Sequence, residues 1–391
     1  MGAKLKLFLE GHKGLMGRIR EACAGQEGIV WFHVASLGEF EAARPVMEAL
    51  RAKDPSKKIL LTFFSPSGYE LKKDYKGADW VFYMPLDTPC NARRFLSIVN
   101  PVKAVFFGGE YWLCFLSELK RRGVDAFLAY VRITPHSTCT KWYGGAVRRA
   151  LRTKYKALFL LDAASVERAQ SFGCANAFFG GDPRVDAVAT VVDAEWHNAV
   201  LEKWLCGRKA FVAGSTMPGE DNAIMIALAN ARTDGKILIV PHDPNPEIVN
   251  FIMKSLTCRA VRFSEAEKCA DLPEVSAMVL DTVGMLSRLY RYAFASYIGE
   301  GFLDSGLHSV LEPASYGMPV VVGPKYWTDV HALSLYEKGA VISIHSAEEL
   351  IRTYDSLVSG TLRTGAMGKI ALEHCNSSRG ATASIVENIL R

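Results

Sequence analysis

The 391-residue sequence lacks the signatures of several common protein classes. It has no run of about 18 apolar residues, so it contains no predicted membrane-spanning helix. Its nine cysteines are scattered without a C-x-x-C pair, which favours reduced thiols in a cytoplasmic protein over a disulfide framework or a zinc site. No P-loop, no H-E-x-x-H and no G-x-G-x-x-G after the first predicted strand occur, so the usual nucleotide and metalloprotease fingerprints are missing.

A strong excess of either charge is also missing. Charged residues make up 22% of the chain, hydrophobic residues 49%, and the net charge is only +5. This composition is typical of a globular enzyme and gives no reason to expect a nucleic-acid partner, although a local anionic partner remains open. The length predicts two domains rather than one.

Residues 1–20 carry five Lys/Arg against a single acid, Glu10, and leucines are interleaved among them. The segment lacks the apolar core and cleavage site of a signal peptide. A basic, leucine-studded helix is suited to an anionic membrane surface. An ordinary solvated helix, or the remainder of a membrane anchor, explains the pattern equally well.

Apolar runs alternate with amphipathic helical patterns along the chain. The predicted strands are 29–36, 58–65, 80–86, 104–109, 126–133, 157–162, 177–181, 210–215, 236–241, 260–264, 277–281, 295–299, 319–323 and 340–344. Acidic, Trp and Lys residues replace the apolar strands over 183–208, and we place a linker at 186–208. This order predicts an α/β fold with two doubly wound Rossmann-like domains, 1–185 and 209–378, facing a central cleft, and a final helix at 379–391.

The most informative stretch is 29–45, IVWFHVASLGEFEAARP. A buried strand ends in a small-residue turn that includes Ser36 and Gly38, and Glu39 opens the helix that follows. Ligands of doubly wound sheets bind at the carboxyl ends of the strands, so Glu39 stands where a reacting group would be held. A carboxylate at this position also caps a helix and complements its dipole, which is the more ordinary explanation.

Three loops in the second half could hold an anionic ligand. Ser215 and Thr216 end a strand just before a helix predicted from Pro218, a setting that suits phosphate. His242 ends the next strand and could contact a phosphate, although surface histidines are common. In the third loop, glycines precede a helix predicted to begin at 307–309, and Glu312 one turn into it could accept both hydroxyls of a ribose or be a plain exposed side chain.

A basic block lies between Ser137 and Leu161, where no acid occurs and where Trp142 and Tyr143 are interleaved. Its cations are Lys141, Arg148, Arg149, Arg152, Lys154 and Lys156. Such runs are usually solvated faces. Because this one follows a strand end, a phosphorylated lipid acceptor is the alternative.

Taken together, these motifs resemble the 3-deoxy-D-manno-octulosonic acid (Kdo) transferases of Gram-negative bacteria, which have the GT-B glycosyltransferase fold. The resemblance spans essentially the whole chain. The segments that carry it are HVASLGEFEAARP (33–45), ILLTFFSPSG (59–68), MPLD (84–87), EYW (110–112), AGST (213–216), DTVGML (281–286), YIGEGF (297–302) and GLHSVLEPASYGMPVVVGP (306–324).

The resemblance implies a CMP-Kdo donor and a lipid A precursor as acceptor, at the cytoplasmic face of the inner membrane, in lipopolysaccharide biosynthesis. It assigns Glu39 as the general base of an inverting transfer without a metal or a separate cofactor. The implied donor-binding residues are Ser215, Thr216, His242, Val283, Gly284, Met285, Gly306, His308, Ser309 and Glu312. The implied acceptor-binding residues are Ser36, Gly38, Arg148, Arg149 and Arg152.

Three positions depart from the family pattern. His242-Asp243 stands where many members have Arg-His, Ser309 replaces an asparagine, and Glu300 replaces a glycine beside an anionic donor. Two alternatives therefore stay open. One is a GT-B transferase that uses another nucleotide sugar, and the other is a non-catalytic sugar- or lipid-binding relative.

Overall fold

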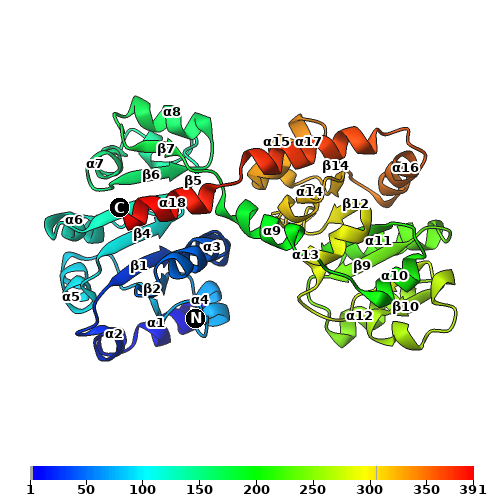
Figure 1. Cartoon of the computed structure of the whole chain (residues 1–391), viewed down its shortest axis with the longest axis horizontal. Helices are drawn as coiled ribbons and strands as arrows, with labels where there is room; N and C mark the ends of the chain where they lie inside the picture. The colour runs from blue at the N-terminus through cyan, green and yellow to red at the C-terminus, as the bar shows by residue number, and fades with distance from the viewer. Residues whose placement is uncertain (1–2, 305) are drawn as a thin grey trace. The chain divides into compact units, whose positions relative to one another are not determined.

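The structure is a computed structural model that describes residues 3–304 and 306–391, and the chain divides into two compact units (Figure 1). The first unit comprises the described residues up to Asp186 together with Ser378–Arg391, and the second comprises Ala187–Ser377. Each unit is built on its own seven-stranded parallel sheet. The α/β class and the two doubly wound sheets predicted from the sequence are confirmed.

The first unit has the strand order β3-β2-β1-β4-β5-β6-β7, in which the chain runs outward from β1 and then returns to place β4 on its other side. Its elements are α1 (Ala3–His12), α2 (Leu15–Cys23), β1 (Ile29–Val34), α3 (Leu37–Lys53), β2 (Lys58–Phe63), α4 (Pro66–Lys72), β3 (Trp80–Tyr83), α5 (Pro89–Val99), β4 (Lys103–Phe107), α6 (Leu113–Arg121), β5 (Asp125–Val131), η1 (Thr138–Thr140), α7 (Gly145–Thr153), β6 (Ala157–Leu160), α8 (Ala163–Ser171), β7 (Ala177–Phe179), the start of α9 (Pro183–Asp193) and α18 (Ala381–Leu390). Residues 1 and 2 of the basic N-terminal segment lie outside the described residues.

Helices cover both faces of this sheet, and every residue of β1 is buried as a result. Successive side chains of a strand point to opposite faces. Trp31 packs into a core with α2, α5 and α6, whereas Phe32 packs into a second core with α3 and α18. The packing of Ile385 and Ile389 in that second core makes α18 part of the first unit.

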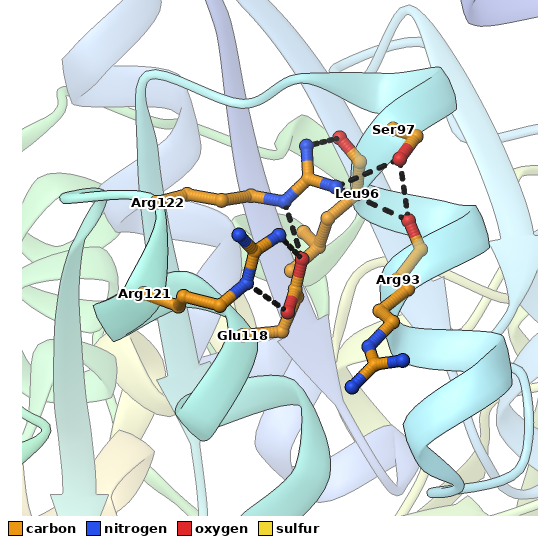
Figure 2. A network of polar contacts seen from close by, with 6 residues as sticks. All are labelled: Arg93, Leu96, Ser97, Glu118, Arg121 and Arg122. Carbon is orange, nitrogen blue, oxygen red and sulfur yellow. Dashed lines mark hydrogen bonds and ion pairs between the residues drawn. The ribbon is translucent and has the colours of Figure 1, made fainter.

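A polar network fastens α6 to α5 (Figure 2). The carboxylate of Glu118 accepts hydrogen bonds from Arg121 at 2.6 Å and from Arg122 at 2.8 Å. Arg122 also donates to the carbonyl of Leu96 at 3.1 Å and to the hydroxyl of Ser97 at 2.7 Å. Hydrogen bonding from the two arginines lowers the pKa of Glu118 to about 2, so the ion pairs persist at any pH above that range.

The second unit has the strand order β10-β11-β9-β8-β12-β13-β14, so β8 and β12 are the neighbours at which the order reverses. Its further elements are α10 (Ala199–Leu205), β8 (Ala210–Thr216), α11 (Glu220–Ala231), β9 (Ile237–Pro241), α12 (Pro246–Ser255), β10 (Ala260–Arg262), η2 (Phe263–Lys268), η3 (Leu272–Glu274), β11 (Ala277–Val279), α13 (Leu286–Leu289), η4 (Tyr290–Tyr292), β12 (Ala293–Ile298), α14 (Leu311–Ser315), β13 (Val320–Val322), η5 (Tyr326–Thr328), α15 (Val330–Glu337), β14 (Val341–Ser343), α16 (Ala347–Val358) and α17 (Thr364–Ser377). Phe211 of β8 packs with α11, α12 and α16 in the core of this unit.

The predicted linker, 186–208, contains most of α9 and all of α10. Trp204 of α10 is fully buried, and its indole N–H donates to the carbonyl of Val275 at 2.8 Å. Only one face of this short helix is apolar, which made the segment look solvated in the sequence. The segment from Ala187 onward belongs to the second unit, and the final helix belongs to the first.

Candidate functional site

The candidate site of the first unit lies where the strand order of its sheet reverses, between β1 and β4. Ligands of open α/β sheets bind at this point, beyond the carboxyl ends of the strands. Residues 35–39 follow β1, and residues 108–110 follow β4. The sequence places a carboxylate in each segment, Glu39 and Glu110.

Glu39 is held by the backbone of its own turn. Its Oε2 accepts hydrogen bonds from the N–H of Ala35 at 2.5 Å and from the N–H of Ser36 at 3.3 Å. The Ser36 hydroxyl accepts in return from the N–H of Glu39 at 3.4 Å, which completes a capping box at the start of α3. Glu39 therefore caps α3, and the capping bonds fix its carboxylate at the edge of the sheet.

The electrostatics of Glu39 go beyond a cap. The pKa of Glu39 is raised from 4.5 to about 7, mainly by burial and also by the charge of Glu110, and the hydrogen bonds from Ala35 and Ser36 offset only part of this increase. Burial also raises the pKa of Glu110. A carboxylate with a pKa near neutrality is suited to general acid–base catalysis. Glu39 can accept a proton at neutral pH.

The other predicted acceptor residues are dispersed. Gly38 is exposed beside Glu39 on α3. Arg148 donates to the carbonyls of Cys139 at 2.8 Å and Lys141 at 2.9 Å, so it braces the loop before α7. Arg149 and Arg152 line a cavity of about 640 Å³ that also includes Phe172, next to the last residue of α8. The three arginines lie on α7, which connects β5 to β6 in the chain, and β5 is the neighbour of β4 in the sheet.

The second unit has its own candidate site, at the equivalent reversal point of its sheet, between β8 and β12. Ser215 has a φ of 52° and Glu300 a φ of 74°, two left-handed non-glycine residues at the ends of neighbouring strands. Such strained positions gather at functional sites. Thr216 is fully buried inside β8, and its hydroxyl has no hydrogen-bond partner among the described residues.

Asp221 joins the two strand ends. Its carboxylate accepts hydrogen bonds from the N–H of Met217 at 3.0 Å, the N–H of Glu300 at 2.7 Å and the hydroxyl of Tyr297 at 2.5 Å. Asp221 is 2% exposed, so all of these bonds form away from water. This one buried carboxylate therefore sets the backbone of both loops.

His308 and His242 stack on each other, with ring centroids 4.6 Å apart and an angle of 20° between the planes. Nε2 of His308 lies 3.0 Å from the carboxylate of Glu300. The structure thus brings together His242, His308 and Glu300, which come from the ends of two strands that flank β8.

The remaining predicted donor residues follow the same edge of the sheet. Residues 283–285, between β11 and α13, include exposed Val283 and left-handed Gly284. Gly306 has a φ of 99°, and the hydroxyl of Ser309 accepts from the N–H of Leu311 at 3.3 Å. The helix predicted from 307–309 is shorter than expected. It begins at Leu311, so Glu312 is its second residue, because Gly306 and the Ser309 hydroxyl hold the preceding residues in a loop.

The chain is similar to proteins of one family. A family model described as 3-deoxy-D-manno-octulosonic-acid transferase (kdotransferase) matches residues 12–187. A curated Haemophilus influenzae protein named 3-deoxy-D-manno-octulosonic acid transferase is 25% identical over 94% of this chain and 87% of its own. An Aquifex aeolicus protein of the same name is 25% identical over 87% of this chain and 89% of its own. The chain is thus similar to Kdo transferases over most of its length.

Solved structures agree on the fold. UDP-GlcNAc 2-epimerase from Neisseria meningitidis is 14% identical, with a TM-score of 0.61 over 93% of this chain and 99% of its own. MurG from Acinetobacter baumannii is 12% identical, with a TM-score of 0.59 over 93% of this chain and 98% of its own. At these identities the likeness concerns the fold alone, and that fold is the predicted GT-B fold.

The structure adds residues to both candidate sites that the sequence did not assign. Gly108 lies against the Glu39 carboxylate, the charge of Glu110 acts on it, and Asp221 braces the strand ends of the second unit. The glycine pair after a strand was a usable signal for the first two. Asp221 lies four residues after Met217 in the sequence and 79 residues before Glu300. No local sequence pattern therefore predicts that its carboxylate connects the two loops.

Within residues 3–304 and 306–391, no helix is long and apolar enough to cross a bilayer. No group of three His, Cys, Asp or Glu side chains in the same residues could hold a metal ion. Independence of metal and cofactor stays a prediction.

Proposed function

We propose that this protein transfers Kdo from CMP-Kdo to a lipid A precursor of the lipid IVA type, with inversion, in lipopolysaccharide biosynthesis. Glu39 takes the proton from the acceptor hydroxyl as its oxygen attacks the anomeric carbon of Kdo and the bond to the CMP phosphate breaks. The observation that carries this mechanism is the buried Glu39 carboxylate at the strand reversal, with its pKa raised to about 7.

The donor assignment rests on the names of the similar proteins and on the candidate site of the second unit. Donor residues predicted from the sequence follow β11, β9, β8 and β12, which are four adjacent strands. Ser215, Thr216, His242, Gly306, His308 and Ser309 would hold the phosphate, Glu312 the ribose, and residues 283–285 the cytosine. Short polar side chains and backbone N–H groups at strand ends are suited to binding an anion.

The acceptor assignment implies peripheral contact with the cytoplasmic face of the inner membrane. Exposed Trp142 and Tyr143 belong to the same acid-free stretch of the sequence as exposed Arg149 and Arg152. On α1, Leu5 and Leu9 are each about half exposed, at 50% and 51%. Amphipathic aromatics, cations and leucines together favour an anionic lipid surface.

The experiment is an assay of purified protein with CMP-Kdo and a tetraacylated lipid A precursor, following CMP release and lipid mass together, with and without a chelator. We expect a lipid mass gain of one or more Kdo units matched by CMP and unaffected by the chelator. CMP binding without any mass gain would contradict the proposal. It would favour either another CMP-activated sugar or a non-catalytic binding protein, the two alternatives that Glu300 motivates.

A further inference from the structure

Glu300 lies among the predicted donor-binding residues of the second unit but has no assigned role there. Its N–H donates to Asp221 at 2.7 Å, which holds the residue at a φ of 74° where an L-residue is strained. The same residue brings its carboxylate to 3.0 Å from the buried Nε2 of His308. A strained backbone thus places an acid against an imidazole within a predicted phosphate site.

Three described groups set the charge of His308. Burial lowers the pKa of His308 most strongly, and the stacked His242 lowers it as well. Glu300 and, more weakly, Asp221 raise the pKa of the same imidazole. Glu300 is therefore the main group that favours the imidazolium, and it opposes both burial and the neighbouring histidine.

We propose that Glu300 is a positioning residue that controls the proton on His308, so that His308 meets the donor phosphate as a cation. The proposal rests on the proposed function only in its choice of a nucleotide phosphate as the anion. Nε2 faces the Glu300 carboxylate as an ion-pair contact without hydrogen-bond geometry, which leaves Nδ1 as the nitrogen that can meet the phosphate. The missing arginine beside His242 is thereby replaced by a cation that exists only while Glu300 supports it.

The charge balance gives the direction of the effect. In the free protein the lowered pKa of the partly buried His308 imidazole favours its neutral form. A phosphate on its other side adds a second anion, which raises the pKa of His308, so binding takes up a proton from solvent. Affinity for the phosphate then falls as the pH rises through the value for the bound state, by up to about tenfold per pH unit for one proton.

The test compares wild type with Glu300→Gln and Glu300→Gly. Glycine adopts a φ of 74° without strain, so at least one variant folds even if the other does not. Histidine NMR titration, assigned with His308→Gln, reports the proton directly. Calorimetry with CMP in two buffers of different ionisation enthalpy reports proton uptake. Glu247→Gln, an exposed carboxylate on α12, is the matched control.

We expect His308 to titrate at lower pH in both Glu300 variants, and CMP binding to lose its proton uptake and most of its pH dependence. The control should match wild type. An unchanged His308 titration in folded variants would overturn the inference. Failure of wild type to bind CMP would instead count against the proposed donor, and the NMR titration would still decide the Glu300–His308 relationship.

Discussion

The carboxyl group of Glu39 occupies the space that a Cβ atom on Gly108 would fill. Gly108 has a φ of 90°, which a residue with a side chain rarely adopts. Glycine is therefore required here for its backbone conformation and because a side chain would overlap with Glu39. The proposed base is thus confined between its own helical turn and the end of the neighbouring strand. The contact links two segments that are about 70 residues apart in the sequence.

Gly108→Ala should displace the Glu39 carboxylate and lower turnover by on the order of 10²-fold, the usual effect of a misplaced reacting group. The left-handed backbone adds about 1 kcal/mol of destabilisation. Gly109→Ala is the control, because its Cβ would meet nothing within 4 Å. Steady-state kinetics and thermal unfolding of both variants check this, and equal turnover in the two would refute the contact's importance.

Glu39→Gln should lower turnover by roughly 10²- to 10⁴-fold, since glutamine keeps the cap acceptor but cannot take a proton. At high pH the free energy of unfolding of this variant should not fall below that of the wild type. The folded state raises the pKa of Glu39 from 4.5 to about 7, so its ionisation destabilises the fold as the pH rises through that window. The variant should therefore be at least as stable as wild type at pH 8, as measured by denaturant unfolding.

The rate with saturating donor should rise with pH through about 7 as Glu39 loses its proton. Glu110→Gln removes a charge that raises the pKa of Glu39, so the inflection should move to lower pH. A pH–rate profile of both proteins measures this shift. An inflection that stays in place would show that another group controls the rate.

Arg122→Ala should destabilise the first unit by about 2 kcal/mol, because it removes hydrogen bonds to α5 and leaves the Glu118 carboxylate with fewer partners. Arg121→Ala should have the smaller effect. Its side chain is 65% exposed against 23% for Arg122, and it bonds only to Glu118 among the described contacts. Urea unfolding of both variants tests the order, and a larger loss for Arg121→Ala would contradict it.

Periodicity was enough to predict the sheets. Each predicted strand has a counterpart, usually ending one to three residues early, because β-rich sequence continues into the loop after hydrogen bonding stops. Glu39 was predictable as well, since a strand, a short turn and a helix start are local features. The helix before β13 was predicted too long, because the patterns near 307–310 do not reveal the loop.

Long-range relationships were out of reach of a single sequence. The Glu39–Gly108 contact, the bonds of Asp221 and the stacking of His242 on His308 each join distant segments. The cap and the base of Glu39 looked like competing explanations in the sequence. In the structure the two roles are compatible, because the bonds that cap α3 also hold the carboxylate in place.

The first unit is built from two separate stretches of the sequence, and this affects its folding during synthesis. Its core is completed by α18, whose residues are translated only after the whole second unit. Ile385, Val386 and Ile389 close an apolar surface over α3 that otherwise stays open on the ribosome. The unit whose synthesis begins first is therefore the one that finishes folding last, and a stalled chain leaves its core exposed to chaperones and proteases.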